Sequence, residues 1–200
     1  FAHLPMILAP DKSKLSKRHG ATSVLEYREM GYLPETMVNF LALLGWSLDD
    51  KTELFTADDL IEHFTIERVG KAGAVFNTDK LSWMNGHYLR QMSSDDLADR
   101  LLEYWRLYPP GEFEGLPDRS LIVRIAPLIQ ERLKTLADAA PWIRFFFVDK
   151  LEFEETELVQ KGMDAPGTKR ALDAAHGVLS ALSRFDSESM EAALRPLAQE

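Results

Sequence analysis

A short basic stretch near the start of the chain holds the residue types best suited to chemistry. In APDKSKLSKRHG, residues 9–20, four cations fall within seven positions: Lys12, Lys14, Lys17 and Arg18. A lysine ammonium is a compact charge on a flexible stem, so it can follow a phosphate group that moves during a reaction. The spacing therefore indicates a mobile phosphate-binding arm. The alternative interpretation is a solvated basic loop without a ligand.

A second basic stretch covers residues 119–144, where five cations face two carboxylates and give a local charge of +3. The cations are Arg119, Arg124, Arg132, Lys134 and Arg144. An arginine fork can bind a phosphate or the edge of an unpaired RNA base. The alternative interpretation is an ordinary charged surface on an amphipathic helix.

Other chemical patterns are absent from the sequence or are better explained by structure. The five histidines include no pair three or four positions apart, and there is no cysteine, so the sequence predicts no metal site. The acidic pairs at 58–59 and 95–96 fall where helices should begin, and carboxylates there cap backbone N–H groups. Four tryptophans occur at helical spacing among leucines and are expected in the core: Trp46, Trp83, Trp105 and Trp142.

The overall composition is that of a globular protein. The 200 residues are 46% hydrophobic and 28% charged, which suffices for one or two domains with a sizeable core. No apolar run approaches the roughly 20 residues of a membrane-spanning helix, and no signal peptide is recognisable. The absence of cysteine fits a reducing cytoplasm. A first residue other than methionine, Phe1, indicates a piece of something longer.

The net charge of −9 is unevenly distributed. Residues 1–20 carry +3, whereas the other 180 residues carry −12. The acidic body argues against a general nucleic-acid binder, because backbone binding needs local cations. Basic patches on such a body can still hold a polyanion at defined places and repel it elsewhere.

The elements that must position these side chains are mostly helical. HLPMIL, residues 3–8, predicts a short buried strand. A short helix over residues 21–31 should stop at Gly31, and a longer one should begin at Pro34 and close at Gly45. The next helix starts are expected at residues with capping side chains: Thr56, Asn77 and Ser93.

A stretch rich in proline and glycine, residues 108–118, is the best candidate for a domain boundary. Beyond it, a helical stripe of apolar residues begins near position 121, and Pro127 should kink or split that helix. Two further helices are expected, one with an apolar stripe over residues 164–185 and one from about Ser187 to the end of the chain.

The basic loop and the residues after it resemble a known family. KLSKR and its continuation HGATSVLEYREMGYLPETMVNFLALLGWS look like the second signature of class I aminoacyl-tRNA synthetases, in the form of the bacterial-type glutamyl-tRNA synthetases. FNTDKLSWMNGHYLR, residues 76–90, is similar to the tRNA stem-contacting region of that family. LIQERLKTLADAAPWIRFFF, residues 128–147, resembles the start of its helical anticodon-binding domain. The resemblance covers nearly the whole chain.

The resemblance implies a mainly α fold in three parts. Residues 1–20 would be the end of a nucleotide-binding α/β domain, residues 21–115 a helical stem-contact domain, and residues 116–200 an all-helical anticodon-binding domain, not complete. The chain would then be the C-terminal portion of a longer enzyme. The first signature of the family and its glutamate pocket are not found in this sequence, so we expect this portion alone to be inactive.

The resemblance also implies a reaction. The parent would be a glutamate–tRNA ligase that activates glutamate with ATP, in the presence of Mg²⁺, and transfers it to the 3′ end of tRNA. Lys14 and Lys17 match the two lysines of the family's loop and are predicted to be catalytic. Together with Ser16 and Arg18 they would bind ATP. Arg18 stands where many class I enzymes carry serine, although arginine is common in the glutamyl group.

The predicted tRNA contacts lie in the second basic stretch: Arg132, Lys134, Arg124 and Arg144. The expected partners are ATP, L-glutamate and glutamate-accepting tRNA, and the protein is expected to be monomeric and cytoplasmic, without a membrane segment. Two rival functions stay open at this point, a non-catalytic tRNA-binding module and a helical protein-interaction domain. The intact lysine loop argues against the first rival, because a pure binder has no need of it.

Overall fold

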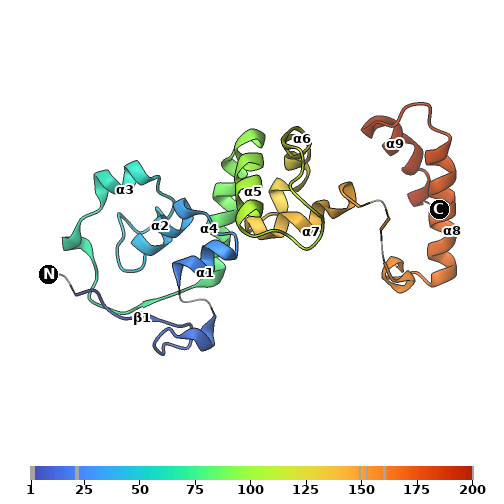
Figure 1. The fold of residues 1–200 in the computed structure, drawn as a ribbon. Helices are drawn as coiled ribbons and strands as arrows, with labels where there is room; N and C mark the ends of the chain where they lie inside the picture. Colours follow the sequence, from blue (N-terminus) through green and yellow to red (C-terminus); the bar gives the residue numbers. More distant parts are fainter. Residues whose placement is uncertain (1–2, 21–22, 149, 152, 160, 200) are drawn as a thin grey trace. The chain divides into compact units, whose positions relative to one another are not determined.

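The computed structural model describes residues 3–20, 23–148, 150–151, 153–159 and 161–199. The chain divides into two compact units, which we call unit 1 (residues 1–149) and unit 2 (residues 150–200). Helices dominate both units, which confirms the mainly α fold predicted from the sequence (Figure 1). Within the described ranges, none of the helices has the length and apolar character needed to span a bilayer.

The described part of unit 1 contains short strands and helices in the order β1 (Ile7–Leu8), α1 (Val24–Glu29), α2 (Pro34–Ala42), α3 (Ala57–His63), β2 (Ala74–Val75), α4 (Thr78–Gln91), α5 (Ser94–Leu107), α6 (Arg119–Ile129) and α7 (Ala139–Ile143). Short 3₁₀ turns connect them: η1 (Lys17–His19), η2 (Ile66–Arg68), η3 (Gln130–Arg132), η4 (Leu136–Asp138) and η5 (Arg144–Phe146).

The strands β1 and β2 form a two-stranded parallel sheet in which Ile7 lies opposite Ala74. The prediction of a buried strand over residues 3–8 is wrong in length and in burial, because the strand has two residues and Leu4 is 74% exposed. In the described part of the chain, β1 has only the equally short β2 as a sheet neighbour. Two such strands cannot cover each other's side chains.

The predicted helix starts are confirmed by their caps. The Asn77 side chain accepts a hydrogen bond from a backbone N–H in the first turn of α4, and Ser93 does the same for α5. Thr56 and Asp59 form the expected reciprocal capping pair on α3. These side chains satisfy N–H groups that have no partner inside the helix, so the starts follow from local chemistry.

Glycine is required at the turn that ends α1. Gly31 has φ +82°, and a Cβ atom at this position would lie 2.6 Å from the backbone nitrogen of Ala137. The Gly31 carbonyl accepts a 3.0 Å hydrogen bond from the Leu136 N–H. The turn after the first helix therefore touches the segment just before α7, although the two are far apart in sequence.

Two buried clusters hold the first part of unit 1 together. The larger one, which we call the tyrosine cluster, forms where α2 packs on α4 and contains Tyr27, Tyr32, Met37, Phe40, Phe76, Leu81 and Met84. The smaller one contains Trp46, Phe55 and Leu60 beside α2 and α3. Leu15 packs against the tyrosine cluster and so ties the basic loop to the helices.

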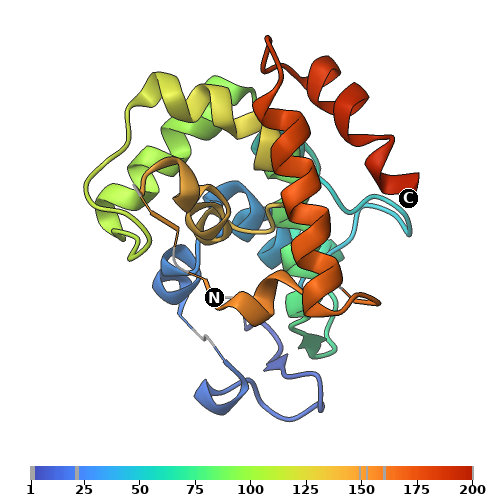
Figure 2. The same cartoon turned by 90° about the vertical axis from the view of Figure 1, so that its right-hand side faces the viewer.

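The third and largest buried cluster fills the space between α5, α6 and α7, and α5 and α6 pack along each other (Figures 1 and 2). It joins Leu101 and Trp105 to Ile122 and Ile143, which lie on the other side of the stretch 108–118. That stretch is a loop over a continuous core. The division of the chain there into a stem-contact and an anticodon-binding domain stays a prediction.

Helix α6 is not split at its proline. It continues through Pro127 and ends at Ile129, where η3 begins. A proline inside a helix removes one backbone hydrogen bond. Because Pro127 stands in the last turn, the helix loses that bond close to the point where it ends anyway.

Two of the four tryptophans lie outside the core. Trp46 and Trp105 are buried as predicted, whereas Trp83 and Trp142 are 48% and 46% exposed. The prediction is wrong for the second pair because α4 and α7 turn other side chains inward. Helix α7, for example, buries Ile143 and two alanines instead of its tryptophan.

Unit 2 consists of α8 (Ala165–Ser180) packed on α9 (Ser187–Leu194), with the turns η6 (Glu155–Leu158) and η7 (Leu197–Gln199) beside them (Figure 2). Helix α9 begins at Ser187 as predicted but ends at Leu194. Among the described residues of this unit, only Thr168 is buried. The apolar stripe predicted over residues 164–185 therefore does not make a closed core, and Leu172 and Phe185 are at least half exposed.

Candidate functional site

The basic loop, residues 9–20, folds back along β1. The Ala9 N–H donates to the Ser13 carbonyl at 2.8 Å, and Lys14 forms an antiparallel bridge back to β1. Between these points Lys12 adopts the left-handed region at φ +63°, which makes a tight turn. Hydrogen bonds therefore fix the backbone at Lys14, one of the two predicted catalytic residues.

Lys14 and Lys17 are both exposed. Within the described residues, no carboxylate lies at ion-pair distance from either ammonium group. Lys17 begins η1 and Lys14 stands at the bridge to β1, so their backbones are held while their long side chains remain in solvent. Ammonium groups of this kind on an anchored loop can bind an anion such as phosphate.

Ser16 and Arg18, the other predicted ATP contacts, are tied into the loop itself. The Ser16 N–H donates to Nδ1 of His19 at 3.2 Å, and its hydroxyl lies 3.1 Å from the same nitrogen. The Arg18 guanidinium lies 3.2 Å from Nε2 of His19 and 3.4 Å from the Ser13 hydroxyl. The four predicted residues thus lie within one short loop, but the lysines differ from Arg18 in having no described polar partner.

His19 is a residue of this loop whose importance was not predicted from the sequence. The histidines were considered there only as possible metal ligands, and their wide spacing argued against that role. The His19 side chain is 15% exposed, and it lies 3.6 Å from the Asp11 carboxylate. That carboxylate accepts hydrogen bonds from the Ser13 hydroxyl and N–H, which hold the pKa of Asp11 below its usual value, and His19 adds to the effect. The signal available in the sequence was the S-x-x-H spacing after a loop, where side chains at both positions can bond across a helical turn.

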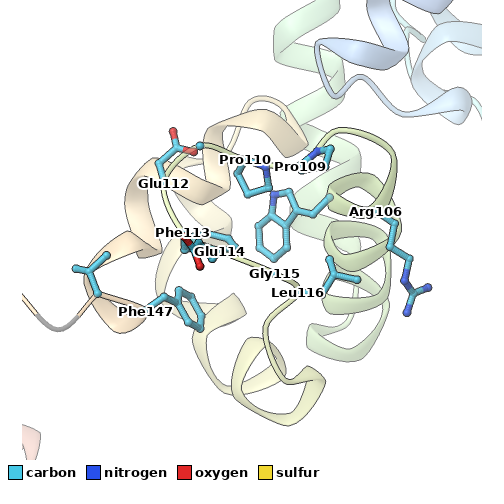
Figure 3. A pocket seen from close by; sticks show the side chains of 12 residues that line it. Arg106, Pro109, Pro110, Glu112, Phe113, Glu114, Gly115, Leu116 and Phe147 are labelled. Atoms are coloured by element: carbon cyan, nitrogen blue, oxygen red, sulfur yellow. The ribbon is translucent and has the colours of Figure 1, made fainter.

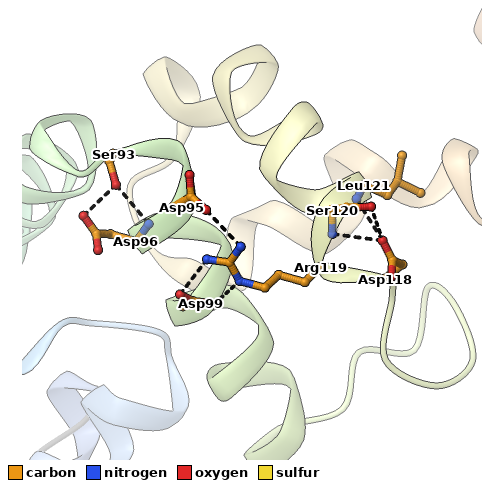
Figure 4. A network of polar contacts seen from close by, with 8 residues as sticks. All are labelled: Ser93, Asp95, Asp96, Asp99, Asp118, Arg119, Ser120 and Leu121. Atoms are coloured by element: carbon orange, nitrogen blue, oxygen red, sulfur yellow. Dashed lines mark hydrogen bonds and ion pairs between the residues drawn. The ribbon is translucent and has the colours of Figure 1, made fainter.

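In the second basic stretch, the exposed Arg119 is neutralised by carboxylates of the same chain (Figure 4). Its guanidinium donates to both carboxylate oxygens of Asp99, at 2.6 and 2.9 Å, and lies 2.9 Å from Asp95. These bonds, to Asp99 first and then to Asp95, raise the pKa of Arg119, and the bond to Arg119 lowers the pKa of Asp99. The local charge counted from the sequence therefore overstates what this stretch offers to a ligand.

Arg132 lies over the ring of Trp142, with its guanidinium carbon 5.0 Å from the ring centroid. This is a cation–π contact, which orients the planar guanidinium without neutralising it. In the part of the chain that the structure describes, no carboxylate is at ion-pair distance from Arg124, Arg132 or Lys134. Trp142 belongs to this site although its helical spacing predicted a core position.

Buried amides anchor the segment that carries Arg132 and Lys134. The side chain of Asn85, which is fully buried, accepts from the Leu33 N–H at 2.9 Å and donates to the Lys134 carbonyl at 2.6 Å. The Gln130 amide donates to two carbonyls at the end of α4, each at 2.8 Å. The backbone of residues 130–134 is therefore fixed on α4, while the side chains of Arg132 and Lys134 are exposed.

The four predicted RNA contacts lie on three elements. Arg132 and Lys134 share the anchored segment, Arg124 is on α6, and Arg144 is in η5. All four side chains are exposed. The described contacts join none of the four directly to another, so their common role as an RNA surface stays a prediction.

Within the described residues, no three histidine, aspartate or glutamate side chains gather in a group that could hold a metal ion. The magnesium ion implied by the resemblance therefore finds no cluster of protein ligands in the described structure.

A surface hollow of about 840 Å³ lies between residues 109–116 and the end of α5 (Figure 3). The rings of Trp105, Phe113 and Phe147 line it. None of the predicted site residues is among its lining residues, so this hollow is separate from the basic loop and from Arg132.

Comparison with known proteins places this geometry in a family. Residues 1–83 match the family described as tRNA synthetases class I (E and Q), catalytic domain, and residues 96–200 match the family described as anticodon binding domain. The basic loop lies in the first match, and the Arg132 segment lies in the second.

Individual proteins agree with these families. Glutamate–tRNA ligase from Dehalococcoides mccartyi (strain 195) is 49% identical over 200 residues, covering 100% of this chain and 41% of the relative. Glutamate–tRNA ligase from Moorella thermoacetica is 43% identical over 204 residues, with the same coverage. The crystal structure of a glutamate tRNA ligase from Elizabethkingia meningosepticum in complex with its amino acid has a TM-score of 0.72 and 29% identity, covering 100% of this chain and 42% of that one.

The two matches and the similarity in fold relate the chain to class I tRNA synthetases that carry an anticodon-binding domain. The chain belongs to the family described as anticodon binding domain, whose model matches more than half of it, and it is similar over its whole length to proteins named glutamate–tRNA ligase. It spans about two fifths of the length of the curated relatives that it matches. The resemblance predicted from the sequence is confirmed.

Proposed function

We propose that the full-length protein is an ATP-dependent ligase that joins glutamate to tRNA. The observation that carries the proposal is the pair of exposed lysines, Lys14 and Lys17, on an anchored loop inside the catalytic-domain match. The relatives named glutamate–tRNA ligase support glutamate as the amino acid. The anticodon-domain match supports tRNA as the acceptor.

The first chemical step would be the activation of glutamate. A carboxylate oxygen attacks the α-phosphorus of ATP, the bond to the bridging oxygen breaks, and pyrophosphate leaves. Negative charge grows on the departing phosphates, and Lys14 and Lys17 stabilise it more in the transition state than in bound ATP. Ser16 and Arg18 shape the loop and contact ATP, and Mg²⁺ would arrive bound to the ATP phosphates.

The second step would be transfer to tRNA. A terminal hydroxyl of the tRNA attacks the activated carbonyl, the bond from that carbonyl to phosphate breaks, and AMP leaves. This step needs the tRNA to be held in one orientation, and we assign that role to cations of the anticodon-domain match: Arg132, Lys134, Arg124 and Arg144. Arg132 is the best supported, because its guanidinium is oriented by Trp142.

The catalytic assignment is tested by pyrophosphate exchange in the full-length protein. Replacing Lys17 by alanine should slow exchange about 100-fold, because one preorganised donor to a growing anion is worth about 3 kcal/mol, while tRNA affinity should change little. Lys12→Asn is a matched control, since it removes the same charge from the same loop, and asparagine tolerates the left-handed backbone there. Exchange at the wild-type rate in Lys17→Ala would overturn the assignment.

The RNA assignment is tested by filter binding of tRNA over a series of salt concentrations. Lys134→Ala should weaken binding and reduce the slope of log affinity against log salt by about 1, since one phosphate contact is lost. Lys169→Ala is the control, because that ammonium already pairs with Asp173 at 2.7 Å. An unchanged slope in Lys134→Ala would remove Lys134 from the interface.

We also propose that the protein works as a monomer in the cytoplasm, where tRNA is charged. The lack of cysteine is compatible with a reducing compartment. Sedimentation of the full-length protein with and without tRNA tests the oligomeric state, and a dimer at working concentration would contradict the proposal.

A further inference from the structure

The imidazole of His19 lies at the centre of the contacts that shape the basic loop. Its Nδ1 faces the N–H and the hydroxyl of Ser16, at 3.2 and 3.1 Å. Its Nε2 lies 3.4 Å from the Ser13 hydroxyl and 3.2 Å from Nε of Arg18. The Asp11 carboxylate is 3.6 Å from the same nitrogen. One largely covered ring therefore joins the start of the loop to η1.

A neutral ring can accept only one of two donors that face it, the Ser16 N–H at Nδ1 and the Arg18 Nε–H at Nε2, both at 3.2 Å, and we take the Ser16 bond as the one that forms. A backbone N–H is only a donor, so the bond from Ser16 requires a lone pair on Nδ1 and places the proton on Nε2. From there the proton faces the Ser13 hydroxyl and the Asp11 carboxylate. Nε2 cannot then accept from Arg18, whose guanidinium keeps its contact with the Ser13 hydroxyl at 3.4 Å.

We propose that His19 is a positioning residue that holds the basic loop so that Lys14 and Lys17 meet the ATP phosphates together. This inference rests on the proposed function of those lysines. Ser16 stands between the two lysines, and the bond from its N–H to the ring closes the turn in which Lys17 begins η1. The ring fixes the backbone, and it leaves both ammonium groups without a partner.

The alternative is that the ring merely fills space in a static loop. The two possibilities differ in whether the loop needs the hydrogen-bond acceptor Nδ1 or only the volume of the ring. If Nδ1 is the essential group, a side chain that offers an acceptor at the same place should restore the loop. His19→Asn does this through its carbonyl oxygen. His19→Leu has similar bulk but no acceptor, so it separates hydrogen bonding from packing.

The first experiment uses nuclear magnetic resonance on the 200-residue chain. The imidazole nitrogen shifts of His19 should show a protonated Nε2 and an unprotonated Nδ1. Exchange of the Ser16 amide proton should be slow in the wild type and in His19→Asn, and at least about tenfold faster in His19→Leu, because the N–H loses its acceptor. A proton on Nδ1, or equal exchange in all three proteins, would overturn the inference.

The second experiment measures pyrophosphate exchange by the full-length protein. His19→Leu should lose about 10- to 100-fold in activity, as expected when reacting groups are misplaced by a fraction of a bond length, whereas His19→Asn should stay within about threefold of wild type. The loss should appear in kcat as well as in KM for ATP, because a misplaced cation stabilises the transition state less well. His63→Gln, on α3 and outside the loop, is the control and should leave the rate of pyrophosphate exchange unchanged.

The outcomes separate this inference from the proposed function. If Lys17→Ala slows exchange but His19→Leu does not, the lysines act as proposed and His19 has no positioning role. If Lys17→Ala has no effect, the function assigned to the loop fails, and the amide exchange of Ser16 still reports whether the ring holds the backbone. Activity that His19→Leu loses and His19→Asn fails to recover would show that Nδ1 is not the group that matters.

Discussion

The two basic segments of unit 1 are held in place by different means. The basic loop is held mainly by its own residues, through Asp11, Ser13 and His19, and by one apolar contact from Leu15. The segment 130–134 is held by bonds to distant parts of the chain. The Asn85 side chain of α4 joins the Lys134 carbonyl to the Leu33 N–H before α2, and the Gln130 side chain donates to carbonyls at the end of α4.

This difference matches what each segment is proposed to do. A loop closed by local bonds can change shape without disturbing the core, which suits lysines that must follow a leaving phosphate. A segment bonded to buried groups cannot move without breaking the core, which suits Arg132 as a reader of fixed RNA features. Removing the anchor of the segment 130–134 should therefore cost mainly global stability, whereas removing the anchor of the basic loop should mainly increase local motion.

The largest expected effect is on the rigid segment. Asn85→Leu leaves the buried Leu33 N–H and the part-buried Lys134 carbonyl without partners, and at up to about 1–3 kcal/mol for each group it should destabilise unit 1 by about 1–6 kcal/mol. Urea denaturation measures the loss. Gln91→Ala, at an exposed position of the same helix, is the control and should change stability by less than about 0.5 kcal/mol. Wild-type stability in Asn85→Leu would remove the contrast between the segments.

The next effect is on the loop. Leu15→Ala removes its apolar anchor, and because Leu15 is only partly buried the free energy of unfolding should fall by about 1 kcal/mol. Amide exchange should accelerate at residues 13–19 and stay unchanged in α4. If exchange in α4 accelerates as much as in the loop, the loop is coupled to the core, and the comparison with the rigid segment is wrong.

An effect of about the same size, on tRNA binding instead of stability, is expected from the stacked pair. Arg132→Ala and Trp142→Ala should each weaken tRNA binding by about 1 kcal/mol, and the double variant should lose less than the sum, because both remove one cation–π contact. Trp142→Phe should retain part of the affinity. Strict additivity in binding measurements would mean that the ring does not act through Arg132.

The smallest effect concerns Arg119 and Asp99, an exposed pair on α6 and α5. The bond to Arg119 lowers the pKa of Asp99, so the pair stabilises the fold above the ordinary aspartate pKa, and this contribution is lost as the pH falls through the lowered value. Asp99→Asn should therefore make the free energy of unfolding depend less on pH in acid, while it should change the free energy of unfolding at neutral pH little. Denaturation between acid and neutral pH measures this, and added salt should shrink the difference. A variant that is less stable in acid than wild type would contradict the assignment.

The sequence predicted well what depends on neighbours along the chain. The caps at Thr56, Asn77 and Ser93 each need a side chain and an N–H within one helical turn, so they are visible in the sequence. The turn at Gly31 was also predictable from the local sequence, because a glycine directly follows the expected helix. The basic loop was also recognisable as part of a family signature, because KLSKR is contiguous.

The predictions from the sequence were poor where the position or role of a residue depends on a contact partner that is distant in the sequence. The helical spacing of Trp142 gave no indication that α7 turns Ile143 inward and leaves the indole outside, under Arg132. The charge of Arg119 was counted as available because its partners, Asp95 and Asp99, lie on another helix. The role of Asn85 was likewise invisible, since its two partners come from distant parts of the chain.

The small amount of burial in unit 2 has a calorimetric consequence. The heat capacity change of unfolding comes mainly from apolar surface that becomes exposed to water. With Thr168 as the one buried position among its described residues, unit 2 should absorb little heat on unfolding and show a broad transition, whereas unit 1 should give a sharp peak. A melting temperature taken from that peak would then measure the stability of the clusters around Tyr27 and Trp105. It would depend very little on the stability of α8 and α9.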